Sequence, residues 1–149
     1  MDFTIELKKR EVDRAAALQH RLQLQDVFLY KTEAAGAGPP IGAVEPVRLH
    51  AELDSEVENR DSTGVDFSVT LRVSCSATLT FHIEATFLVR YRFADQAKPA
   101  SEIEIESFRK SHAILAVWPY LREFVQTIAA RMGFPTEPLP LLRLVLRKG

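Results

Sequence analysis

The sequence contains little of what several large classes of protein require. Its single cysteine, Cys75, cannot form a disulfide within the chain, and its place in an apolar alternation predicts a small buried residue. The 19 Lys and Arg residues nearly balance the 20 Asp and Glu residues, so the net charge of −1 offers no basic surface to nucleic acid. No apolar run approaches the roughly 20 residues of a membrane span, and the first residues, MDFTIELKKR, lack the apolar core of a signal peptide. We therefore expect a cytoplasmic protein with no nucleic-acid partner and no direct membrane insertion.

Motifs that would indicate catalysis are also missing. The sequence contains no GxSxG, HExxH, CxxC or GxGxxG pattern. A metal or acid–base site is one alternative, because His50, Glu52 and Asp54 share a face of one predicted strand, while His82 and Glu84 share a face of another. No third His or Cys completes a ligand set, and alternation alone places polar residues on a solvated strand face. The sequence therefore predicts no enzyme, no metal site and no cofactor.

The sequence does contain one helix with signals at both ends. Pro119 suits the first turn of a helix, Gly133 suits the residue just beyond its end, and Pro135 prevents its continuation. These signals predict a helix over Pro119–Met132, with apolar residues recurring every 3.6 residues on one face. We assign this helix to the core or to a subunit interface through Tyr120, Leu121, Phe124, Val125, Ile128 and Met132.

The segment 134–149 after this helix is apolar but cannot be helical throughout. Phe134, Leu139, Leu141 and Leu142 are interleaved there with prolines. Loops are normally polar because they run over the surface of a protein. An apolar loop therefore either packs into a crevice or leaves apolar surface for a partner.

Alternation of apolar and polar residues predicts four strands. Residues 22–32 form the first, which is apolar on parts of both faces and should therefore lie between other elements, and Val47–Glu58 forms the second. From Val65 to Phe93 every odd-numbered residue is apolar, and one strand of that length would exceed the size of a domain. The chain must reverse around Ser76–Thr80, through an odd-length loop or a bulge that keeps the parity unbroken.

The remaining segments predict further helices and complete the fold class. Residues 1–21 form an N-terminal helical extension, whose helix spans Glu6–Arg21. A later helix begins at Ser101, where a capping box with Glu104 is expected, and reaches the central helix near Ala116. Its inward residues are Ile105, Phe108 and His112. The whole chain, 1–149, is thus predicted to be a single α+β domain, a four-stranded antiparallel sheet with helices packed on one face.

The central helix and the loop after it also carry a family resemblance. The string Trp118-Pro119-Tyr120-Leu121-Arg122-Glu123, followed by Arg131, Phe134-Pro135 and an alternating Leu-Pro run, resembles the signature of the SecB family of protein-export chaperones. The likeness is most specific over Val117–Leu141 and continues collinearly over the strands before it. Residues 1–20 resemble instead the SecB-like chaperones that control toxin–antitoxin modules.

This resemblance implies a function and an assembly. It implies an ATP-independent molecular chaperone, a holdase for unfolded, hydrophobic polypeptide, which serves protein transport or one dedicated antitoxin. It also implies a homotetramer arranged as a dimer of dimers. The client-binding groove implied by the family is floored by one strand and flanked by a crossover loop; the matching residues are Val47, Leu49, Ala51 and Leu53 in the strand and Phe134, Leu139, Leu141 and Leu142 in the loop.

Two departures from the family pattern bear on this reading. The C-terminal helix of SecB is longer than the residues after Pro140 allow, so the lid of the groove should be shortened. In SecB an acidic sheet surface docks the SecA motor; Asp26 matches one of its carboxylates, but Tyr30 stands where another is expected. The rival hypothesis is a non-catalytic structural or interaction protein whose apolar surface is only an oligomer interface.

Overall fold

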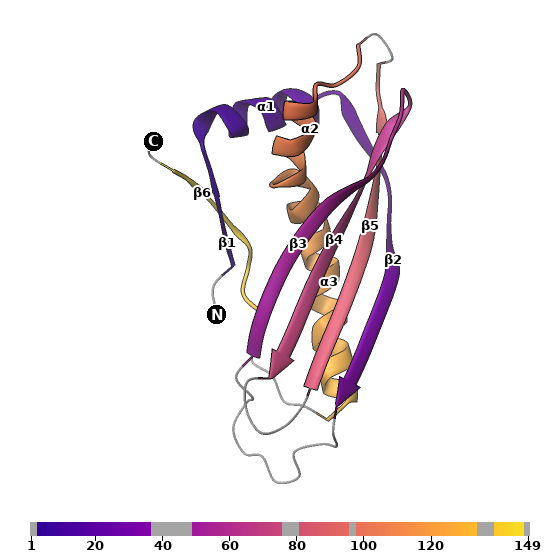
Figure 1. The fold of residues 1–149 in the computed structure, drawn as a ribbon, viewed down its shortest axis with the longest axis vertical. Coiled ribbons are helices and arrows are strands. Elements are labelled where there is room, and N and C mark those ends of the chain that lie inside the picture. The colour runs from indigo at the N-terminus through magenta and orange to yellow at the C-terminus, as the bar shows by residue number, and fades with distance from the viewer. Residues whose placement is uncertain (1–2, 37–48, 76–80, 96–97, 134–138, 148–149) are drawn as a thin grey trace.

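Four long strands form one antiparallel sheet, and helices follow it in the sequence (Figure 1). The computed structural model describes residues 3–36, 49–75, 81–95, 98–133 and 139–147. The sheet has the strand order β2-β5-β4-β3. Its strands are β2 (Leu22–Gly36), β3 (Leu49–Arg60), β4 (Gly64–Cys75) and β5 (Phe81–Phe93), and the helices after it are α2 (Glu102–Arg109) and α3 (His112–Arg131). The α+β class and the four-stranded antiparallel sheet predicted from the sequence are confirmed.

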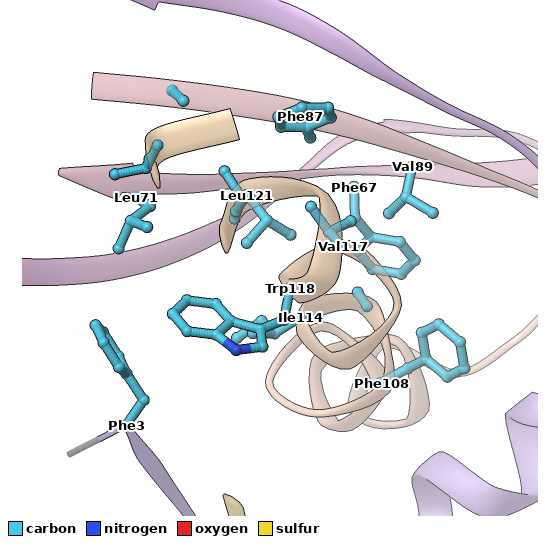
Figure 2. Close-up of a cluster of buried hydrophobic side chains, with 14 of the residues drawn as sticks. Phe3, Phe67, Leu71, Phe87, Val89, Phe108, Ile114, Val117, Trp118 and Leu121 are labelled. Atoms are coloured by element: carbon cyan, nitrogen blue, oxygen red, sulfur yellow. The ribbon is translucent and has the colours of Figure 1, made fainter. Parts of the chain in front are cut away.

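The odd-numbered residues of β4 and β5 form the floor of the core. Val73 lies opposite Ile83, so the inward parity is the same on both strands, as the unbroken alternation predicts. The strands end at Cys75 and resume at Phe81, so the predicted reversal falls on residues 76–80, which lie outside the described part of the chain. Helix α3 packs on this face, as Figure 2 shows for Leu71, Phe87 and Leu121 among others. The side chain of Cys75 also lies outside the described residues.

Helix α3 begins earlier than predicted. Ser101 caps α2 as expected, since its Oγ accepts a hydrogen bond from the Glu104 N–H at 3.2 Å. Helix α2 ends at Arg109, however, and α3 starts at His112, so Pro119 lies inside α3 instead of in its first turn. A proline inside a helix removes one backbone hydrogen bond and costs about 3 kcal/mol.

Burial before Pro119 explains why the helix continues through it. The residues of α3 that precede the proline on the core side are fully or nearly fully buried; they are Ala113, Ile114, Val117 and Trp118. Each large side chain buried this way contributes about 1.5 to 3 kcal/mol, which offsets the missing hydrogen bond. The predicted end of the helix is confirmed, because Gly133 has a φ of 80° just after the last turn.

The two ends of the chain pair with each other, which the sequence did not predict. Residues expected to form one helix from Glu6 contain instead strand β1 (Thr4–Leu7) and helix α1 (Lys9–Gln19). The expected loop and tail contains strand β6 (Arg143–Leu146), which pairs in parallel with β1. In the part of the chain that the structure describes, no helix is both long and apolar enough to cross a membrane.

Strand β2 also differs from expectation. It continues to Gly36 and lies at an edge of the sheet, paired with β5 only. The prediction that it lies between other elements is therefore wrong. Apolar residues on both of its faces are exposed, as at Phe28, Leu29 and Tyr30, while Leu22 is buried and Val27 is partly buried. Apolar residues on both faces of this strand therefore do not mean that other elements of the chain cover both faces.

Candidate functional site

An open groove runs between β1 and the free edge of β3. Its volume is about 360 Å³, which lies in the range of ligand-binding pockets. One wall consists of residues 3–7, and the other comes from β3. The apolar lining residues are Phe3, Ile5, Leu7, Ala51, Leu53, Ile114 and Leu142, and the polar ones are Thr4, Glu6, Asp54, Ser55, Arg109 and Lys110.

The groove brings together three of the predicted client-binding residues. Ala51 and Leu53 come from β3, and Leu142 comes from the tail just before β6. Ala51 lies opposite Val73 and Leu53 opposite Leu71, so both side chains lie on the core face of the sheet. They are only half-buried, because β3 is an edge strand and α3 packs mainly over β5 and β4. These positions expose apolar surface without belonging to the interior.

The tail is held in place by hydrogen bonds from α3 and by the pairing with β1. Trp118 Nε1 donates to the Pro140 carbonyl at 3.1 Å, and Arg122 Nε donates to the Leu139 carbonyl at 2.6 Å. The Trp118 ring also contacts the Phe3 ring, with 4.6 Å between centroids. The tail therefore positions both Leu142 and the β1 wall of the groove.

The other predicted client-binding residues do not line this groove. Leu139 is only 2% exposed and belongs to the core, which contradicts its expected place on the client surface. Its side chain is buried because the tail is anchored to α3 at that residue. Leu141 is 70% exposed and is not among the residues that line the groove. The predicted positions Val47 and Phe134, and the side chain of Leu49, lie outside the described residues.

Polar contacts close one end of the groove. Arg109 Nη1 donates to the Ser55 carbonyl at 2.9 Å, while Arg109 Nη2 donates to Glu106 Oε2 at 2.8 Å. The hydrogen bond from Arg109 lowers the pKa of Glu106, so this carboxylate stays ionised at neutral pH. The Ser55 N–H donates to Asp54 Oδ1 at 2.9 Å. The C-terminal end of α2 is thereby fixed to β3 at Ser55.

Sequence reasoning missed the wall formed by β1. Phe3, Ile5 and Leu7 are apolar and alternate with Thr4 and Glu6, which is a strand pattern. The run is too short to outweigh the helical pattern that follows it. Ile114 was missed for a different reason, because the predicted central helix began only at Pro119.

The predicted histidine clusters lie apart. Strand β4 separates β3 from β5, so His50 and Glu52 cannot meet His82. His50 lies 3.8 Å from Glu52, and His82 lies 3.6 Å from Glu33 on β2, all at the surface. Among the residues described, no three His, Cys, Asp or Glu side chains come together at a spacing that would hold a metal ion.

The sheet face that carries these histidines is less solvated than predicted. Ser68, Thr86 and Leu88 of the two central strands are buried on this face. Ser68 Oγ donates to Glu58 at 2.7 Å, and the hydroxyls of Thr70 and Thr86 lie 2.8 Å apart. These three hydroxyl groups therefore bond to other residues of the sheet.

The predicted stripe on α3 is largely buried, and its remaining apolar surface continues onto β2. Leu121, Val125 and Ala129 are buried, while Phe124, Ile128 and Met132 are partly buried against the core. Tyr120 is 49% exposed and contacts Phe87, which lies opposite Leu29 of β2. Leu24, opposite Tyr91, lies on the same face of β2 as Leu29, and we name the exposed residues Leu24, Leu29 and Tyr120 the β2–α3 surface.

Asp26, the predicted partner-docking residue, lines a different hollow. This hollow has a volume of about 510 Å³, is polar, and also contains Arg60, Arg90 and Arg92. Arg90 forms an ion pair with Asp66 at 3.2 Å. The surroundings of Asp26 are therefore of mixed charge and not an acidic surface.

Comparison with known proteins identifies the fold. A structure search matches the SecB-like chaperone Rv1957 of Mycobacterium tuberculosis, solved in complex with a ChAD peptide from the antitoxin Rv1956 HigA1. The match has a TM-score of 0.76 and 20% sequence identity, and covers 89% of this chain and 99% of that one. A protein of unknown function from Streptococcus agalactiae matches with a TM-score of 0.37 and 15% identity over 80% of this chain, which is too distant to guide interpretation. No protein-family model and no curated protein sequence matches the chain. The SecB-like fold expected from the family resemblance is confirmed.

Proposed function

We propose that this protein is an ATP-independent chaperone that binds unfolded, apolar-rich polypeptide in the groove between β1 and β3. One observation carries the proposal: Ala51, Leu53 and Leu142, chosen as client-binding residues from separate segments of the sequence, line the same open groove. The structural neighbour from M. tuberculosis, which has this fold, was solved with a peptide bound. Its antitoxin peptide makes a dedicated antitoxin the favoured client here, ahead of export-bound preproteins.

The chemistry of the groove suits weak and adaptable binding. A client side chain buried there gains about 1.5 to 3 kcal/mol at best, and no covalent step or nucleotide is needed. Apolar pockets discriminate poorly between side chains of similar size, so selectivity for one sequence is low at each groove. Strong binding then requires several grooves that engage one chain.

Several linked grooves require an oligomer, and the β2–α3 surface supports one. We infer a homotetramer, a dimer of dimers, in which the exposed Leu24, Leu29 and Tyr120 contact other subunits. The proposal places the protein in the cytoplasm, where its client is made. It does not include docking of SecA through Asp26, because that carboxylate lines a hollow of mixed charge and not an acidic surface.

The second candidate is a structural or interaction protein with no client. The same exposed residues, Leu24, Leu29 and Tyr120, favour it, since a permanent subunit interface explains them without any bound peptide. This candidate leaves the groove between β1 and β3 without a role. The two candidates therefore differ in what the groove does.

Suppression of aggregation distinguishes the two candidates. A reduced, permanently unfolded model protein is allowed to aggregate, and light scattering is followed with and without this chain. The chaperone reading expects suppression that is lost in Leu53→Ser/Leu142→Ser and retained in Leu141→Ser, an exposed leucine outside the groove. Absence of suppression by the wild-type chain, at a several-fold excess of subunits, would favour the structural candidate.

A further inference from the structure

Strand β3 has a free edge that opens into the groove. It pairs with β4 on one side only, and the Ser55 carbonyl points away from β4, since it accepts a hydrogen bond from Arg109 of α2. Backbone groups of an antiparallel strand alternate between its two sides, so the N–H and C=O groups of Ala51 and Leu53 point the same way as those of Ser55. Within the residues that the structure describes, these groups of Ala51 and Leu53 have no hydrogen-bond partner. Unpaired edge groups readily pair with another extended chain.

The free part of this edge ends at Ser55. Its N–H donates to Asp54 Oδ1 at 2.9 Å, its carbonyl accepts from Arg109 Nη1 at 2.9 Å, and its side chain is also bonded to Arg109. The residue is only 6% exposed. A strand added to β3 can therefore pair with Leu53 but not with Ser55.

The side chains next to the free edge are apolar. Leu53 and Ala51 lie beside Ile114 of α3 and Leu142 of the tail, with Ile5 of β1 on the opposite wall. An extended segment paired with the edge would turn every second side chain toward these residues. An extended segment on this edge can therefore form backbone hydrogen bonds with β3 and bury its apolar side chains in the groove at the same time.

We infer that an unfolded client segment binds as an additional antiparallel or parallel strand on the free edge of β3, bonded to Ala51 and Leu53 and stopped at Ser55. This inference rests on the proposed chaperone function and specifies how the peptide is held. The client is an extended segment with apolar residues at alternate positions. Main-chain hydrogen bonds supply sequence-independent affinity, as in other cases of strand addition.

A single extended segment suits this edge better than the edge strand of a second copy of the chain. Strand β1 forms the opposite wall of the groove, so the free edge of β3 faces a groove that has β3 on one side and β1 on the other. The neighbouring strands of a second sheet would have to pass through that wall. A strand that comes alone avoids this clash.

Alternate N-methylation of a peptide tests the inference. The probe is the tightest-binding member of a set of overlapping short peptides that cover an unfolded model protein. Each backbone N–H is methylated in turn, and affinity is measured by fluorescence anisotropy. Methyl groups on N–H groups that bond to β3 should weaken binding by about three- to tenfold, while those at intervening positions should have little effect. Uniform sensitivity along the peptide would overturn strand addition but leave the proposed function standing, whereas failure of every peptide to bind would remove both.

A change in β3 provides the reciprocal test. Ala51→Pro deletes the edge N–H and is tolerated there because that N–H makes no bond to β4. It should weaken the unmethylated peptide by a similar factor, while Ala51→Val, which is close in size and keeps the N–H, should not. Thermal melting of both variants checks that they are folded. If Ala51→Pro does not fold, the methylation series on the wild-type chain decides whether the client pairs with β3. A mass that falls in Ala51→Pro with unchanged peptide affinity would assign the edge to a second copy instead and overturn the inference.

Discussion

Strands β2 and β3 both lie at edges of the sheet, yet their apolar residues meet different surroundings. Beside β3 the N-terminal strand, the tail and the end of α2 form a bounded groove, in which Ala51 and Leu53 are half-buried. On β2 the exposed apolar surface is open: Leu24 and Tyr30 are more than half exposed, although Leu22 is buried and Val27 packs against the core. A bounded groove suits a ligand that comes and goes, whereas an open apolar surface suits a partner that stays.

Both edges depend on helix α3. Its buried face covers the sheet between them and lines the groove through Ile114, while the exposed Tyr120 belongs to the β2–α3 surface. The two surfaces can therefore be separated experimentally only by changes that leave this helix in place. The predictions below begin with a change in α3 that should disrupt both surfaces and continue with changes that affect one surface only.

The largest effect is expected from Val125→Asp. Val125 is 1% exposed, so the variant places an unpaired carboxylate in the core and should lower the free energy of unfolding by about 3 kcal/mol or more. Ile128→Asp, at a partly buried position of the same stripe, should cost less. Urea unfolding measures both. Equal and small losses would show that the stripe is not buried and that α3 does not hold both edges.

The second prediction breaks only the β2 edge. Leu29→Asp/Tyr120→Asp places charges on the β2–α3 surface and should lower the mass of the assembly measured by light scattering. Affinity for a short peptide should change by less than about twofold, since the groove is elsewhere. Ile103→Asp, at an exposed isoleucine of α2, is the matched control and should keep the wild-type mass. A wild-type chain that is already a monodisperse monomer at micromolar concentration would rule out the assembly.

The third prediction breaks only the β3 edge. Leu53→Ser/Leu142→Ser removes apolar contact from a groove that already meets water, so the free energy of unfolding should fall by no more than about 1 kcal/mol per residue. Peptide affinity should fall by about tenfold or more, and the mass should not change. Leu141→Ser is the control in both measurements, because that side chain is exposed outside the groove. A strongly lowered melting temperature would instead make Leu53 and Leu142 core residues.

The sequence predicts the sheet better than it predicts the groove, because the two depend on different numbers of residues. The inward face of β4 and β5 has an apolar residue at every second position, so many residues together determine one register. Strands β1 and β6 span four residues each and come from opposite ends of the chain, so neither run is decisive alone. The groove needs that pairing, and its wall of residues 3–7 was therefore not foreseen.

Two single residues show where local rules give way to packing. Pro119 has the chemistry of a helix start, but burial of Val117 and Trp118 extends α3 past it. Leu139 and Leu141 stand in the same proline-rich run, but Leu139 is buried where Arg122 and Trp118 bond to the tail, whereas Leu141 is exposed. No periodicity exists in such a run to separate an inward leucine from an outward one.

The smallest effect is expected from pH, and it should leave the β2–α3 surface unchanged. His112 begins α3, directly after the α2 segment that binds Ser55, and its ring stacks on Phe108 with 5.2 Å between centroids. Burial lowers the pKa of His112 below its usual value, so the unfolded chain takes up a proton at a higher pH than the folded chain does.

The sign of the pH effect follows from that difference. The stabilising contribution is fully present above the usual histidine pKa of about 6.5 and is lost as the pH falls toward the lower pKa of the folded state. Urea unfolding followed from about pH 8 down to pH 5 should therefore show a decline that is shallower in His112→Gln than in the wild-type chain. His50→Gln, at an exposed histidine of β3, should keep the wild-type decline. The mass of the assembly should stay constant over the same pH range, since His112 does not belong to the β2–α3 surface. Parallel declines in wild type and His112→Gln would show that this ring is as free to take up a proton in the folded chain as in the unfolded one.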